Sequence, residues 1–114
     1  MAAVRTLIAG CGYVGCALGE RLVAEGHEVW GLRRDCSGLP ASFRAVAADL
    51  GNTSELRALP PDVDYLVYAA SAGESSEAAY RRAYVLGLGN VLAALRGRPP
   101  RRAFFTSSTA VYAR

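Results

Sequence analysis

Short apolar runs alternate with stretches of helical periodicity along this chain, and each apolar run has the length of a buried strand. The runs predict five strands, at residues 6–9, 28–32, 45–48, 64–70 and 103–106. After the first run, a glycine-rich turn opens a helix that should end at Gly26. This alternation is typical of a parallel sheet covered by helices.

Two more helices are predicted between the later strands. A short one, capped by Asn52 or Thr53, precedes the fourth strand. A longer one begins near residues 75–76, and its apolar face is expected to hold Tyr84, Leu88, Val91, Leu92 and Leu95. Because glycine costs up to about 1 kcal/mol inside a helix, Gly87 and Gly89 are expected to let this helix approach its neighbour closely.

We therefore predict one domain over residues 1–114, an α/β Rossmann-type fold with a doubly wound parallel sheet of strand order 3-2-1-4-5. Such a sheet normally continues past its fifth strand with another helix and strand. Since the sequence ends at Arg114, we expect a truncated chain that lacks a C-terminal catalytic part. A partner such as a second copy, forming a homodimer, could also cover the bare edge.

Composition excludes several classes of protein. The 114 residues are 52% hydrophobic and 20% charged, as in a globular domain, and no apolar run is long enough to cross a membrane. The N-terminus does not resemble a signal peptide, so a cytoplasmic protein is expected. The net charge of +3 is scattered, which argues against a nucleic-acid partner. Three cysteines without metal-ligand spacing predict no metal site.

The turn after the first strand carries the pattern G-x-G-x-x-G, from Gly10 through Gly12 to Gly15. In this setting Gly10 permits the sharp turn, Gly12 admits a pyrophosphate against bare backbone, and Gly15 brings helix and strand together. The helix start, at Tyr13 and Val14, presents unpaired amides and a partial positive charge that favour phosphate. We predict a dinucleotide site here, the alternative being a purely structural turn.

The end of the second strand bears on the choice of cofactor. An acid there would hold the ribose hydroxyls of NAD, but this chain has Arg33 followed by Arg34. Paired guanidinium groups suit a 2′-phosphate, so we predict NADP rather than NAD. Alternatively the two arginines are solvated and Asp35 is the ribose acid. Asp49, after the third strand, could equally meet the adenine edge or cap the short helix.

Three further segments resemble motifs of one enzyme family. They are Asp49-Leu50 after the third strand, residues 64–71 at the fourth strand, and Thr106-Ser107-Ser108-Thr109-Ala110-Val111-Tyr112 after the fifth. With the glycine turn, they make the chain similar to the N-terminal part of an extended short-chain dehydrogenase/reductase, the NAD(P)-dependent epimerase/dehydratase family. The resemblance implies cofactor contacts at Asp49, Leu50, Ala69, Ala70 and Ser71. It also implies that Ser108 hydrogen-bonds a substrate hydroxyl or carbonyl.

The sequence also departs from that family. The usual catalytic pair is a tyrosine followed four residues later by a lysine, and all thirteen basic residues of this chain are arginine. Tyr80 and Tyr84 are four residues apart but cannot replace that pair. Many relatives carry an asparagine at the position of Tyr84. We therefore expect this chain by itself to be inactive.

Two functions follow as hypotheses. The first is the NADP-binding part of an epimerase, dehydratase or reductase that acts on a nucleotide sugar or a similar hydroxyl-bearing small molecule. The second is a non-catalytic NAD(P) sensor, such as the regulatory domain of a potassium-uptake system, which residues 7–15 and 26–29 also resemble. Those domains usually end the second strand with an acid, so Arg33 favours the enzyme.

Overall fold

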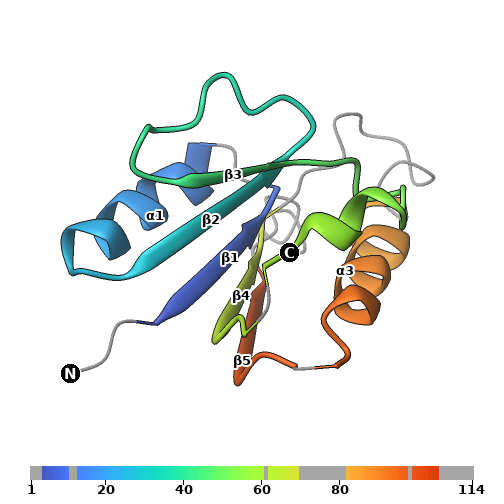
Figure 1. Cartoon of the computed structure of the whole chain (residues 1–114). Coiled ribbons are helices and arrows are strands. Elements are labelled where there is room, and N and C mark those ends of the chain that lie inside the picture. Colours follow the sequence, from blue (N-terminus) through green and yellow to red (C-terminus); the bar gives the residue numbers. More distant parts are fainter. Residues whose placement is uncertain (1–3, 11–12, 61, 70–81, 98, 106–114) are drawn as a thin grey trace, which may run out of the picture.

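The computed structural model describes residues 4–10, 13–60, 62–69, 82–97 and 99–105. Five strands form one sheet in the order β3-β2-β1-β4-β5, and every neighbouring pair is parallel (Figure 1). The strands are β1 (Arg5–Ala9), β2 (Glu28–Arg33), β3 (Arg44–Ala47), β4 (Tyr65–Tyr68) and β5 (Arg102–Phe105). The predicted fold class and strand order are confirmed.

Helices lie on both sides of the sheet. Helix α1 (Tyr13–Ala24) lies on one face, and α3 (Leu88–Ala94) lies on the other with the 3-10 helix η1 (Glu55–Ala58) (Figure 1). A π-helical segment, η2 (Arg82–Gly87), leads directly into α3, and the predicted start of this helix near residue 75 lies outside the described residues. No described helix has the length and apolar content needed to cross a membrane.

The alternation of side chains along the strands divides the core into two layers. On β1, Leu7 and Ala9 face η1 and α3, where Leu56, Val91 and Leu95 close the larger layer. Ile8 points the other way and packs with Val29, Phe43 and Val67 beneath α1. Because both faces of the central strands are covered, β1 and β4 are apolar along most of their length, as the sequence predicted.

The connection between β2 and β3 contains no helix in the described structure, and Phe43 does part of the covering instead. Its ring lies so close to Gly19 of α1 that a Cβ there would come within 2.4 Å of Phe43 Cζ. The glycine therefore lets α1 and the 34–43 loop pack directly against each other. No local sequence pattern indicates this role for Gly19, because Phe43 lies 24 residues away in the chain.

Two expectations for the later helix were wrong. Leu92 is 41% exposed, because it lies about 100° around α3 from Val91, and Val91 and Leu95 already fill the core. Among the described residues, no atom beyond the neighbouring backbone of its own helix would lie within 4 Å of a Cβ added to Gly89, so this glycine makes no close approach to another described element. The π-helical turn before α3 also breaks the uniform 3.6-residue period on which the prediction depended.

Candidate functional site

The carboxyl ends of four neighbouring strands bring the predicted binding residues to one edge of the sheet. Gly10 follows β1, Arg33 ends β2, Asp49 comes just after β3, and Ala69 follows β4. Backbone bonds continue beyond the strands. The amides of Gly10, Ala48 and Ala69 donate to the carbonyls of Leu32, Arg33 and Ala9, at 2.9, 2.9 and 2.8 Å. These bonds hold the first residues after β1, β3 and β4 against the neighbouring strands. The backbone at this edge of the sheet is therefore fixed.

The two described ends of the turn from β1 into α1 are Gly10 and the start of the helix. Gly10 adopts φ +79°, a left-handed conformation that favours glycine, and Gly15 is buried in the first part of α1. The first turn of α1, which begins with Tyr13 and Val14, contains no acidic residue that would neutralise the positive end of the helix. Cys11 and Gly12 lie outside the described residues, so the role of Gly12 stays a prediction.

At the end of β2, Arg33 is half-buried and Arg34 is exposed. A Cβ on Gly38 would lie 3.9 Å from Arg33 Nη1, so the guanidinium lies beside the 34–43 loop. Asp35 Oδ1 accepts a hydrogen bond of 3.0 Å from the backbone amide of Ser37. Hydrogen bonds from Ser37, together with the charge of Arg33, lower the pKa of Asp35. The carboxylate is thus held within its own loop.

After β3, Asp49 takes part in the loop rather than in the helix that follows. Its Oδ1 accepts from the Gly51 amide at 2.8 Å, and its own amide donates to Glu55 Oε1 at 2.7 Å. The start of η1 is held by Asn52, whose Oδ1 accepts from the amides of Ser54 and Glu55 at 3.0 and 3.3 Å. The N-cap position itself is Ser54, which makes no side-chain capping bond, so the prediction of Asn52 or Thr53 as the cap was wrong. Asn52 instead bonds the start of η1 from two residues before the cap, and Asp49 does not cap it.

Two residues of this region were missed by the sequence analysis. Glu55 binds the Asp49 amide, and Asn90 of α3 donates from Nδ2 to the Leu50 carbonyl at 2.9 Å. The spacing of Asn52 and Glu55 is that of a capping box, which could have drawn attention to Glu55. No local pattern indicates Asn90, because its partner lies 40 residues away in the sequence.

Besides Gly12, three more predicted site residues, Ala70, Ser71 and Ser108, lie outside the described residues. Ala69 is half-buried and packs against the α1 side of the core, which places the end of β4 next to the β1 turn. Leu50 is likewise half-buried against the core under α3. The described part of the site therefore consists of Gly10 and the start of α1, the two arginines, the Asp49 loop and the end of β4.

Comparison with known proteins decides the family. Residues 6–114 match the model of the NAD dependent epimerase/dehydratase family. The chain belongs to this family. The resemblance stated from its motifs is thus confirmed.

Three relatives illustrate how far the likeness of this epimerase/dehydratase chain extends. A Methylobacillus flagellatus structure assigned to the NAD-dependent epimerases/dehydratases is 40% identical to this chain, with a TM-score of 0.77. The alignment covers 99% of this chain and 40% of the Methylobacillus chain. An Agrobacterium tumefaciens short-chain dehydrogenase/reductase superfamily protein with bound NAD is 25% identical with a TM-score of 0.79, covering 96% and 34%. The dTDP-6-deoxy-L-talose 4-dehydrogenase (NAD(P)(+)) of Kitasatospora kifunensis is 40% identical over 86 residues, which are 70% of this chain and 27% of that enzyme. The chain therefore spans well under half the length of each relative.

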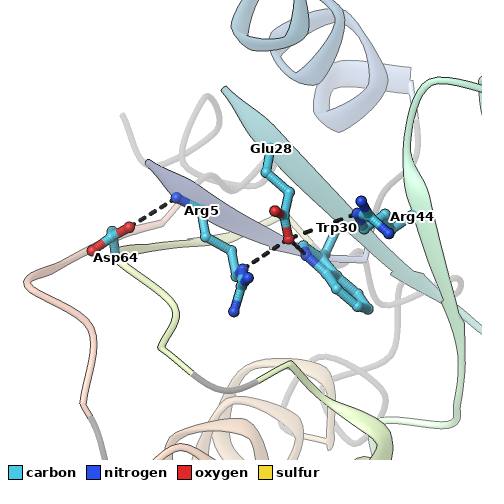
Figure 2. Close-up of polar contacts among 5 residues, drawn as sticks. All are labelled: Arg5, Glu28, Trp30, Arg44 and Asp64. Atoms are coloured by element: carbon cyan, nitrogen blue, oxygen red, sulfur yellow. Dashed lines mark hydrogen bonds and ion pairs between the residues drawn. The ribbon is translucent and has the colours of Figure 1, made fainter. Parts of the chain in front are cut away.

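A second polar cluster lies at the opposite edge of the sheet of this epimerase/dehydratase chain (Figure 2). Glu28 Oε2 accepts from Arg5 Nε at 2.8 Å and from the indole N–H of Trp30, and Arg44 Nε lies 3.7 Å away. The Arg44 guanidinium carbon also lies 5.8 Å from the centre of the Trp30 ring. Asp64 Oδ2 accepts from the Arg5 amide at 2.8 Å.

This cluster joins the amino ends of β1, β2 and β3, whereas the candidate site lies at their carboxyl ends. The hydrogen bond from Trp30 lowers the pKa of Glu28, and the positive charges of Arg5 and Arg44 act in the same direction. Glu28 is therefore ionised when folded and holds side chains from three strands in register. We interpret the cluster as structural.

Proposed function

We propose that this chain binds NADP within an enzyme that transfers hydride to and from a nucleotide sugar or a similar hydroxyl-bearing small molecule. The observation that carries the proposal is the left-handed Gly10 between β1 and α1, at the edge where Arg33, Asp49 and Ala69 also gather. Ligands of doubly wound sheets bind at this edge, outside the carboxyl ends of the strands. Membership of the family supports the same conclusion.

The β1 turn fits the pyrophosphate of a dinucleotide. With no side chain at Gly10 or Gly12, the anion could approach the backbone at the start of α1. The amides there, with Tyr13 and Val14 in the first turn, would donate to phosphate oxygens without needing a cationic side chain. The 12-residue helix has no acidic residue in that turn to compete with the ligand.

The arginines after β2 support NADP over NAD. Arg33 and Arg34 provide planar donors that suit a 2′-phosphate, and Arg33 lies at the strand end where the ribose of the cofactor is expected. Asp35 is the nearest acid that could hold ribose hydroxyls, but its Oδ1 already accepts from Ser37. The same proposal assigns Asp49 and Leu50 to the adenine, and Ala69, Ala70 and Ser71 to the far side of the cofactor.

The reaction would need more than this chain provides. A bound cofactor supplies or accepts the hydride, and the Ser108 hydroxyl would donate to the substrate oxygen as that oxygen gains negative charge. The tyrosine and lysine pair usual in the family cannot be formed, since the chain contains no lysine. The name of the talose dehydrogenase relative includes both a sugar nucleotide and NAD(P), which supports this class of substrate.

Calorimetric titration of the chain with NADPH and NADH tests the proposal. We expect NADPH to bind more tightly, and Arg33→Asp to reduce the ratio of the two affinities by about tenfold or more, because a charge-assisted bond to phosphate is lost. Arg96→Asp is the matched control. It makes the same charge change on an exposed residue just beyond the C-terminal end of α3 and should leave the ratio unchanged. Equal affinities of the parent for the two nucleotides would contradict the preference for NADP.

A further inference from the structure

The loop that carries Asp49 is tied to a helix far away in the sequence. Asn90 Nδ2 donates to the Leu50 carbonyl at 2.9 Å, and both residues are half-buried. In Figure 1 the orange helix α3 lies beside the green helix η1 that ends this loop, and the two elements are in contact. The hydrogen bond therefore joins α3 to the segment leaving β3, at the edge of the candidate site.

The position of Asp49 is fixed from both sides by neighbouring bonds. Its amide donates to Glu55 Oε1 on η1, and the next residue, Leu50, is held by Asn90 on α3. Helix α3 is itself anchored by Val91, which is fully buried next to Asn90 in the sequence. Since loops that leave a sheet are otherwise its most mobile parts, anchoring to a packed helix gives Asp49 and Leu50 a defined place.

We infer that Asn90 is a positioning residue for the adenine end of the cofactor, which it influences through Leu50 and Asp49 without touching the ligand. The inference rests on the proposed function, because it assumes that the Asp49 loop contacts adenine. The required group is the amide N–H of Asn90, since a carbonyl oxygen needs a donor. An aspartate at position 90 would instead point a carboxylate oxygen at the Leu50 carbonyl.

Another asparagine near the same loop provides a matched control. Asn52 uses its side-chain oxygen, which accepts from the amides of Ser54 and Glu55. Asn52→Asp keeps that acceptor, whereas Asn90→Asp removes the donor, although the two substitutions are chemically the same. A general effect of added negative charge would appear in both variants, and loss of the Asn90 bond would appear in one.

The experiment compares the affinities of NADPH and its hypoxanthine analogue, in which an oxo group replaces the 6-amino group of adenine. The readout is the ratio of the two affinities, which uniform loss of stability would not change. We expect the parent and Asn52→Asp to prefer the adenine form. Asn90→Asp should reduce that preference by about fivefold, the effect of one hydrogen bond. If Asn90→Asp does not fold, Asn90→Ala removes the same donor and has higher helix propensity.

The outcomes separate this inference from the proposed function. A parent that binds no dinucleotide would overturn both. A parent that binds NADPH but does not distinguish the two bases would overturn only the role of the loop. An unchanged preference in folded Asn90→Asp or Asn90→Ala would overturn the role of Asn90, and the expected loss in Asn90 variants alone would support it.

Discussion

Gly10 and Gly26 show that the backbone conformation of a single glycine can be predicted from its place in the sequence pattern. Both have left-handed backbones, with φ +79° and +91°, at the predicted turn and at the predicted end of the first helix. Helix caps are harder to predict than glycine conformations. The start of η1 has three nearby side chains that could accept hydrogen bonds from its amides, those of Asp49, Asn52 and Thr53. Which of them does so depends on the path of the loop, and the structure assigns the bonds to Asn52.

Thr6 offers a prediction about a buried polar atom. Its side chain is 2% exposed, and among the described residues Oγ1 has no hydrogen-bond partner. Thr6→Val replaces the hydroxyl by a methyl group of similar size, so we expect the free energy of unfolding to rise by about 1 kcal/mol. Urea denaturation measures the change. Thr6→Ser, which keeps the hydroxyl and loses the methyl, should lower stability, and a less stable Thr6→Val protein would show that the hydroxyl is satisfied.

At the scale of elements, the strands could be predicted because burial on both faces leaves a continuous apolar run. Leu7, Ile8 and Ala9 illustrate this, since they face opposite layers and all are fully buried. Helix faces were less predictable. Leu88 and Leu92 are four residues apart and were both predicted on the apolar face of one helix, but Leu88 packs against the core and Leu92 is 41% exposed. The π-helical turn before α3 changes the period, and no sequence signal indicated it.

The cross-strand cluster at the amino edge predicts a dependence of stability on pH. The folded pKa of Glu28 is lowered, so its stabilising contribution is complete above the ordinary pKa of about 4.5 and is lost as the pH falls through the folded value. Glu28→Gln should therefore cost at most about 1 kcal/mol at pH 7, because the partly exposed ion pairs are screened. The cost should shrink below pH 4.

Urea denaturation at several pH values measures this difference, and Trp30 provides a second signal. It is the only tryptophan in the chain and donates to Glu28, so its fluorescence should report protonation of the carboxylate. Glu20→Gln, which changes an exposed carboxylate on α1, is the control. An effect of Glu28→Gln that is the same at pH 7 and pH 3.5 would show that the cluster does not depend on the charge of Glu28.

At the scale of the whole molecule, the site could be predicted in outline because the carboxyl ends of parallel strands meet at one edge. Gly10, Arg33, Asp49 and Ala69 stand at those ends in the sequence and in the structure. The bond between Asn90 and Leu50 could not be predicted, because it depends on how α3 packs against the sheet. Local sequence patterns thus predict where the strands end. The contacts that hold the loops after those strands can be identified only in the tertiary structure.

Binding of NADPH should stabilise the whole domain if the glycine turn holds the pyrophosphate. A ligand that binds only the folded state at about 100 times its Kd adds about 2.7 kcal/mol. For a domain of this size, that should raise Tm by about 10 °C or more. Differential scanning calorimetry with and without NADPH measures the shift. Gly12→Val should abolish it, because the added side chain would block approach of the phosphates to the backbone.

A second glycine variant separates ligand binding from the general effect of replacing a glycine. In the part of the chain that the structure describes, a Cβ on Gly89 would meet no atom within 4 Å outside the backbone of its own helix, α3. Gly89→Ala should therefore raise the Tm of the free chain, since alanine is favoured over glycine inside a helix, and should leave the NADPH shift unchanged. The valine side chain of Gly12→Val would occupy the place expected for the pyrophosphate. If NADPH still raises the Tm of this variant, the nucleotide must therefore bind elsewhere.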